Sequence, residues 1–428
     1  MAAPGLPFPE LWDHIIGFIP PVPSLTPTLK HLALVCRTFA SAAQRSLFRS
    51  ISIEDGRRIV IEPEMVVDRS AITGPIVAGH LADVLASSPH LLPFIRELTV
   101  KSEHTECYRI LSEIPWVNLR SLHFKDLLRI PSSARGAVET LISMPSLRRL
   151  EISTYSGTVP NTPTAQWMQW MLSSCSPHLE FLVLEGVYMD SAELSQGTTN
   201  HTASNRRPRL CELSLTHCNG ISGLLLHAFD FSTSSLRMVQ CIDTHGPDVV
   251  LFMRQIGSSV EHLVVSSQDR GHVNEQLDLA VTFPALTTIS SPTPPGIPGE
   301  NLTFGPAGAI VANAISPVST FNTMLRSASA DNKITRIVFE AEVGFFLFAD
   351  YNSWFERPIA EFEEIAASHL HALQVVEVHV EPQPRVHGYQ PYETVEESVH
   401  KAFPKLHQKG LLAVSLLSPT HDHEYEYY

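Results

Sequence analysis

A short phrase recurs along most of this chain: an apolar residue, two variable residues, a second apolar residue, one variable residue and a third apolar residue. The clearest copy is Leu210-Cys-Glu-Leu213-Ser-Leu215, and the copy at Leu286 lacks the third apolar position. Such alternation of apolar and polar residues is typical of a strand with one buried face. The recurrence therefore predicts many similar strands. The copies begin at residues 95, 119, 147, 179, 210, 236, 260, 286, 334, 373 and 411.

The spacing of these copies is similar to that of leucine-rich repeats, which have periods of about 20–29 residues. The first eight copies lie 24 to 32 residues apart, and the later gaps of 48, 39 and 38 residues indicate insertions or decayed repeats. We expect one strand and one helix per repeat, stacked into a curved solenoid with the strands on its concave side. An ordinary α/β fold with strands that look alike by chance is the alternative. Apolar residues at helical spacing predict helices over Cys107–Ile114, Arg135–Met144, Ala165–Ser174, Pro247–Ile256 and Ile359–His369.

Every second residue of each predicted strand should face the concave surface, because strand side chains alternate between two faces. These positions form a candidate substrate face, although a solvated strand face without a ligand explains them equally well. In the turn after one strand, Cys218 stands where the repeat requires Asn or Cys, and we expect its polar group to satisfy backbone donors. The candidate face comprises His123, Lys125, Arg149, Glu151, Phe181, Glu185, Glu212 and His262.

The first fifty residues have a different pattern. Leu11, Ile15 and Phe18 recur at helical spacing before a proline-rich connector at 20–28, and a second helical stripe runs from Leu29 to Phe39. Alternating isoleucines at positions 51 and 53 then begin a strand. Three short helices cannot bury enough apolar surface alone. They need either a partner protein or the following domain, which they would then cap.

Several short landmarks follow one another in the first forty residues: Leu6-Pro7, Glu10-Leu11, Ile15-Ile16, Leu32-Ala33-Leu34-Val35-Cys36-Arg37 and Phe39. With these landmarks the segment from Leu6 to Ser50 resembles the F-box, and most closely the F-box proteins abundant in mushroom-forming fungi. Its connector, PPVPSLTPT, is longer and richer in proline than the usual F-box link.

This resemblance implies a non-catalytic substrate-recognition subunit of a ubiquitin ligase. The N-terminal helices would bind a Skp1-like adaptor, and through it a cullin–RING ligase, while the solenoid would hold an unknown protein substrate. Recognition of this kind uses apolar side chains as anchors in a groove. The alternative is a leucine-rich-repeat scaffold outside any ligase. The implied Skp1-binding residues are Leu6, Pro7, Leu11, Ile15, Ile16, Leu32, Val35, Cys36 and Phe39.

The expected fold class is therefore α/β, with a three-helix F-box module followed by a leucine-rich-repeat solenoid. We expect five segments along the chain. They are the helical module at 1–53, a linker or cap at 54–90, more regular repeats at 91–290, irregular repeats at 291–418 and a tail at 419–428.

Motifs that carry chemistry are missing from the sequence. It contains no H-E-x-x-H, G-x-S-x-G, Walker A or G-x-G-x-x-G motif, so we expect no enzyme activity and no cofactor. The scattered histidines and cysteines predict no metal site. Trp167 and Trp170 are expected in the core, and the acidic run at 361–364 on a solvated helix face. An enzyme on an unrecognised α/β fold is the remaining alternative.

Charge and cysteine usage limit the partners and the compartment. A net charge of -14 disfavours nucleic acid and anionic membranes as the main partner. The sequence shows no signal peptide and no apolar run long enough to span a membrane. Six cysteines without a C-x-x-C pair indicate a reducing compartment, so we expect the cytoplasm, the nucleus or both.

Overall fold

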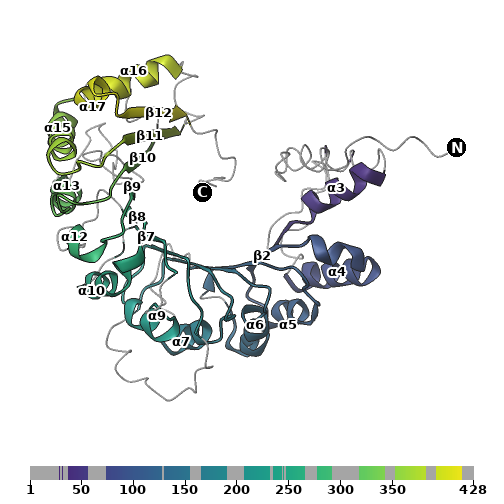
Figure 1. Cartoon of the computed structure of the whole chain (residues 1–428). Coiled ribbons are helices and arrows are strands. Elements are labelled where there is room, and N and C mark those ends of the chain that lie inside the picture. Colours follow the sequence, from purple (N-terminus) through teal and green to yellow (C-terminus); the bar gives the residue numbers. More distant parts are fainter. Residues whose placement is uncertain are drawn as a thin grey trace, which may run out of the picture. The chain divides into compact units, whose positions relative to one another are not determined.

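The computed structural model describes eleven continuous ranges of the chain. Its contacts divide the chain into two compact units, Met1–Gly186 with Asn200–Pro208, and Val187–Thr199 with Arg209–Tyr428. In each unit parallel strands form one layer, and helices cover one face of that layer (Figure 1). The ranges are 37–55, 74–127, 130–154, 165–189, 207–231, 235–242, 247–265, 277–291, 318–342, 352–381 and 392–416, with single positions 28, 31 and 244.

In the first unit five parallel strands pair in the order in which they occur along the chain. The strands are β1 (Ser50–Glu54), β2 (Glu97–Lys101), β3 (Ser121–Lys125), β4 (Arg149–Ser153) and β5 (Phe181–Glu185). The helices are α3 (Arg37–Leu47), α4 (Gly74–Ser87), α5 (Thr105–Glu113), α6 (Arg135–Ile142) and α7 (Ala165–Ser173), with short 3-10 turns η1 (Pro89–Phe94) and η3 (Ser132–Ala134).

The second unit repeats this topology with seven parallel strands, again paired in chain order. They are β6 (Glu212–Thr216), β7 (Met238–Ile242), β8 (His262–Val265), β9 (Thr288–Ser291), β10 (Arg336–Glu342), β11 (Val375–Glu381) and β12 (Leu412–Leu416). The helices are α9 (Ser222–Ala228), α10 (Pro247–Ile256), α12 (Leu279–Thr282), α13 (Val318–Arg326), α15 (Asn352–Ser368), α16 (Tyr392–Ala402) and α17 (Pro404–Gln408), with the 3-10 turn η4 (Gly257–Ser259).

The strands predicted from the recurring phrase are confirmed. Its eleven copies coincide with β2 to β12, the isoleucines at 51 and 53 lie in β1, and α5, α6, α7, α10 and α15 overlap the five predicted helices. Equivalent positions of the phrase lie side by side: Leu98 is aligned with Leu122, which is aligned with Leu150. The mixed α/β class with parallel strands is therefore correct.

A ladder of backbone hydrogen bonds sets this alignment at the beginning of each strand. The carbonyl of Arg49 accepts from the N–H groups of both Arg96 and Glu97, at 2.9 and 3.0 Å. The carbonyl of Arg96 accepts in the same way from Arg120 and Ser121, and the pattern continues through the first unit. In the second unit the carbonyls of residues 211, 237, 261, 287 and 335 each accept two such bonds. One carbonyl per repeat thus fixes where the next strand starts.

In the turns that follow two of the strands, a side chain donates to backbone carbonyls. The thiol of Cys218 donates to the carbonyl of Thr216 at 3.4 Å. Thr244 occupies the equivalent position one repeat later, and its hydroxyl lies 3.1 Å from the carbonyls of Leu215 and Ile242. The role expected of Cys218, accepting from backbone donors, stays a prediction.

Three of the turns after strands contain a left-handed residue immediately after the strand: Asp126, Gly186 and His217 have φ of 59°, 67° and 50°. Gly220, three residues further on than His217, has φ of 69° and lies directly against the carbonyl oxygen of Met189. A side chain at residue 220 would meet that oxygen. This turn therefore requires glycine for both its conformation and its packing.

Replacing Gly220 should cost more than replacing a glycine with the same backbone conformation in open space. Gly410 has φ of 67° with nothing near its missing side chain. We expect Gly410→Ala to lose about 1–2 kcal/mol, the cost of a left-handed residue, and Gly220→Ala to lose clearly more. Urea denaturation of both variants measures this, and equal losses would show that the contact with Met189 is unimportant.

The longer repeats of the second unit pack around four phenylalanines. Phe339 of β10 lies with its ring centroid 6.0 Å from that of Phe321, 5.3 Å from Phe362 and 6.3 Å from Phe403. All four side chains are fully buried. The large spacings after residue 286 thus accommodate longer helices and a shared aromatic core within the repeat pattern.

The prediction for the acidic run at 361–364 is wrong at Glu363. This side chain is 2% exposed, and its Oε1 accepts from the backbone N–H groups of Lys405 and Leu406 at 2.7 and 2.9 Å. A carboxylate on α15 therefore caps the first turn of α17, where N–H groups have no partner within the helix. Glu364, by contrast, is exposed and lies 3.6 Å from the Lys405 ammonium.

These neighbouring carboxylates provide a matched pair for mutagenesis. Glu363→Ala should lower the free energy of unfolding by about 2–3 kcal/mol, because two buried N–H groups lose a charged acceptor. Glu364→Ala should cost no more than about 0.5 kcal/mol, since exposed ion pairs contribute little. Chemical denaturation followed by circular dichroism compares the two. Similar losses in both variants would contradict the capping role.

Candidate interaction surface on the strand faces

The side of each sheet opposite the helices is formed by alternate strand residues. In β2, β3, β4, β6 and β7 the second and fourth residues are buried, whereas the first, third and fifth are partly exposed. We call the partly exposed side of β1–β5 the first strand face and that of β6–β11 the second strand face. Six predicted residues lie on the first face and two on the second: His123, Lys125, Arg149, Glu151, Phe181 and Glu185, then Glu212 and His262.

Four of these residues form one polar cluster on the first strand face, and Ser153 joins it. His123 lies opposite Glu151, and Lys125 lies opposite Ser153. The Nε2 atom of His123 is 3.2 Å from Ser153 Oγ, and its Nδ1 atom is 3.6 Å from the Glu151 carboxylate. Arg149 donates from Nε to the same carboxylate. Phe181 and Glu185 lie in the same rows as Arg149 and Ser153, one strand further along.

Sequence reasoning missed the carboxylate that holds Lys125. Its ammonium lies 3.3 Å from Oε1 of Glu54, two strands away on β1. Immediately before β1, the guanidinium of Arg49 donates from Nε to Glu97 at 3.2 Å. The period-two rule applied to β1 would have placed Glu54 on this face. The pairing of Glu54 with Lys125 across β2 depends on how β1, β2 and β3 are aligned, which the sequence does not specify.

His123 is kept neutral by its surroundings. Burial lowers the pKa of its imidazole, and the nearby cations Lys125 and Arg149 act in the same direction, whereas Glu151 and Glu54 oppose them. The neutral ring can either donate to Ser153 Oγ or accept from it, depending on which ring nitrogen carries the proton.

The second strand face carries a related cluster that includes His262 but not Glu212. His262 Nε2 lies 2.7 Å from Ser290 Oγ. Arg336 binds both oxygens of Glu377 at 2.9 and 2.6 Å, and His379 Nε2 lies 3.0 Å from the same carboxylate. Hydrogen bonds from Arg336 lower the pKa of Glu377. Burial, followed by the charge of Arg336, lowers the pKa of His262.

The histidine–serine pairs have the same geometry in both units. In each, the serine lies two residues beyond the residue opposite the histidine on the next strand. The first pair also has a carboxylate near its histidine, in the order serine, histidine, glutamate. Arg149 donates to that carboxylate, however, and the 3.6 Å between His123 Nδ1 and the Glu151 carboxylate is too long for a hydrogen bond. The arrangement therefore holds side chains in defined positions on the face and provides no aligned catalytic relay.

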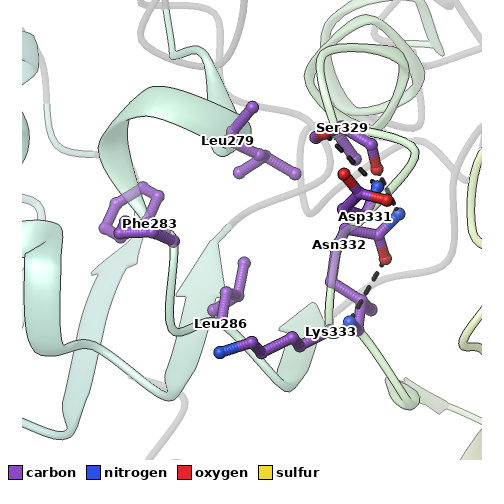
Figure 2. A pocket seen from close by; sticks show the side chains of 11 residues that line it. Leu279, Phe283, Leu286, Ser329, Asp331, Asn332 and Lys333 are labelled. Atoms are coloured by element: carbon purple, nitrogen blue, oxygen red, sulfur yellow. Dashed lines mark hydrogen bonds between the residues drawn. The ribbon is translucent and has the colours of Figure 1, made fainter.

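A small cavity of about 190 Å³ lies in the second unit between the turn before β9 and the turn before β10 (Figure 2). Leu279, Phe283 and Leu286 line one side, and Ser329, Asp331, Asn332 and Lys333 line the other (Figure 2). The amide of Asn332 donates to the carbonyls of Ser329 and His369 at 2.6 and 2.8 Å. That amide is therefore used to hold the turn, which limits what the cavity offers a ligand.

Other groups with potential chemistry are buried or dispersed. No disulfide joins the five cysteines in the described ranges, and burial raises the pKa of Cys107 and of Cys175 to about 12, which leaves both as unreactive thiols. No group of three histidine, cysteine or acidic side chains in the described part of the chain is arranged to hold a metal ion. Trp170 is buried in the core as predicted, whereas Trp167 is half-buried at its edge, with its ring centroid 5.0 Å from that of Trp170.

Most of the implied Skp1-binding residues lie outside the described residues. This applies to Leu6, Pro7, Leu11, Ile15, Ile16, Leu32, Val35 and Cys36, whereas Phe39 lies within α3. Their role stays a prediction. Among the described helices, none has the length and apolar character needed to cross a membrane. No protein-family model and no curated protein matches this chain.

The two partly buried histidines of the strand faces should make folding sensitive to acid. Because the folded protein lowers the pKa of His123 and of His262, the unfolded chain takes up protons first as the pH falls below about 6.5. Their contribution to stability is thus complete above that pH and is lost on acidification. We expect the free energy of unfolding to fall between pH 7 and pH 5, and to fall less in His123→Gln and in His262→Gln.

Denaturation curves at several pH values test this expectation. Between pH 7 and pH 8 both imidazoles are neutral in either state, so substitution should leave the pH dependence there unchanged. A wild-type protein and both variants with the same slope below pH 6.5 would show that neither histidine is responsible.

Proposed function

We propose that this chain is the substrate-recognition subunit of a Skp1–cullin–F-box ubiquitin ligase, with its strand–helix repeats acting as degenerate leucine-rich repeats. The sequence landmarks between Leu6 and Phe39 carry this proposal. Two structural features support it: a parallel array with one partly exposed strand face, and a helix, α3, at the end of the matched segment. The compartment we propose is the cytoplasm, the nucleus or both.

The connection between α3 and β1 suits such a receptor. Only Phe48 and Arg49 separate the helix from the strand, and the backbone N–H of Phe48 donates to the carbonyl of Gln44 at 2.9 Å. A short, hydrogen-bonded junction would hold an adaptor-binding segment close to the array, and a flexible linker would not.

Such a receptor accelerates ubiquitin transfer by tethering. Holding a substrate on the same scaffold as the conjugating enzyme replaces a bimolecular encounter with an intramolecular one, and the effective concentration depends on the geometry of the tether. The proposal asks for no covalent step from this chain. Partly exposed strand residues held by ion pairs, such as Arg149 with Glu151, would provide the substrate contacts.

A scaffold outside any ligase is the second candidate, and the burial of Ala42 and Ala43 favours it. These side chains show that α3 covers apolar surface, as a cap on the first repeat would. In that case the N-terminal helices complete the fold and bind no adaptor.

Co-purification with Skp1 separates the two functions. We expect the tagged wild-type chain to retain Skp1 and the double variant Leu11→Asp with Ile15→Asp to lose it, because charged side chains disrupt an apolar anchor site. The matched control is Ile76→Asp with Val84→Asp, which changes two exposed apolar residues of α4 and should retain Skp1. Failure of the wild type to bind Skp1, or equal loss in both double variants, would exclude the ligase function.

A further inference from the structure

The cavity that lies before β9 and β10 stands beside a helix of only about one turn. Helix α12 has four residues, whereas α10 before it has ten and α13 after it has nine. A helix this short covers less of the neighbouring strands, which leaves room for the cavity. The inner wall consists of buried apolar side chains: Leu279, Phe283, Leu286, Ala328 and Ile334.

Hydrogen bonds hold both walls of the cavity in place. The hydroxyl of Ser327 accepts from the N–H of Leu279 at 2.8 Å and donates to the carbonyl of Met324 at 2.6 Å, which joins α12 to the end of α13. On the other side the amide of Asn332 donates to two carbonyls, and its Oδ1 accepts from the N–H of Ile334 at 3.2 Å. A ligand would therefore meet a site that is already formed, and little entropy would be lost in ordering it.

Two opposite charges stand at the rim of this apolar space. Asp331 and Lys333 line the cavity, are exposed, and form no ion pair with any residue in the described ranges. In the view of Figure 2 the Lys333 side chain extends toward Leu286, whereas Asp331 lies nearer to Leu279. Because the amide of Asn332 is used within the turn, these two groups are the charges that a ligand would meet.

The volume of the cavity limits the ligand to a small molecule. Sites for drug-sized molecules enclose about 300–1,000 Å³, whereas this cavity encloses about 190 Å³. The complementary ligand has an apolar part, one positive group and one negative group. A free α-amino acid with an aliphatic side chain has all three. The end of a peptide chain carries only one of the two α-charges, and an internal residue carries neither.

We propose that this cavity binds a free aliphatic amino acid, such as leucine. Its side chain would occupy the apolar interior between Leu279, Phe283 and Leu286. The Asp331 carboxylate would accept hydrogen bonds from the α-ammonium group, and the Lys333 ammonium would donate to the α-carboxylate. The site goes beyond the proposed ligase function and does not depend on it.

Isothermal titration calorimetry with the purified full-length chain tests the proposal. The probes are leucine, glycine, leucinamide and N-acetyl-leucine, which lack in turn nothing, the side chain, the carboxylate and the ammonium group. We expect leucine to bind with a dissociation constant of about 0.1–1 mM, as suits so small a ligand. Glycine should not bind, and the other two should bind more weakly than leucine.

Two substitutions at the rim should act on different probes. Lys333→Gln should weaken leucine binding about three- to tenfold, the effect of one charge-assisted contact at an exposed site, and leave leucinamide binding unchanged. Asp331→Asn should weaken binding of leucine and of leucinamide and should not weaken binding of N-acetyl-leucine. A purely structural role of either residue would affect all probes equally.

Three further variants complete the design. Ala280→Leu places a larger side chain at the exposed part of the lining and should abolish leucine binding. Asp83→Asn on α4 and Lys409→Gln after α17 remove exposed charges elsewhere and should change nothing. Circular dichroism checks that each variant is folded.

The outcomes decide the proposal. Leucine binding with the expected dependence on the two charges supports it. No heat on addition of leucine, equal binding of glycine, undiminished binding in Ala280→Leu, or equal loss in the two control variants would overturn it. Binding of leucinamide and N-acetyl-leucine as tightly as leucine would also overturn it, because the cavity would then recognise only an apolar side chain. The assay contains no Skp1, so failure of the ligase function is observed separately.

Discussion

The ladder of backbone carbonyls at the strand starts is the constraint on which the other features depend. From β1 to β5 and from β6 to β11, one carbonyl per repeat accepts two N–H groups of the next repeat, which sets the first residue of the next strand. A shift of one residue would reverse every side chain of that strand between the two faces. The ladder therefore keeps the apolar residues under the helices and the polar residues on the strand faces. The ion pairs on the strand faces form only because this alignment brings their residues together.

Much of the fold follows from the sequence because the strand signal is local. The phrase that begins at Leu119 specifies a short strand and states which side of it is apolar, and the same holds for each copy. Alternation alone also placed His123, Lys125 and Arg149 on one face. These are consequences of a period of two, which requires no knowledge of what lies nearby.

What the sequence could not give depends on contacts between distant segments. Glu363 was expected to be solvated because it stands in an acidic run, but it is buried because α17 places its N–H groups there. The pairing of Glu54 with Lys125 depends on how β1 and β3 align through β2. The adaptor-binding role proposed for residues before Arg37 rests on a sequence resemblance.

Within each unit the sheet pairs strands that are consecutive in the chain. An interior repeat consequently contacts its two neighbours across similar surfaces. Duplication of one whole strand–helix repeat would preserve the existing pairings except at the point of insertion, and it would lengthen the strand face by one strand. A gene encoding such an array can therefore acquire new recognition surface by unequal recombination, with the older repeats retaining their structure.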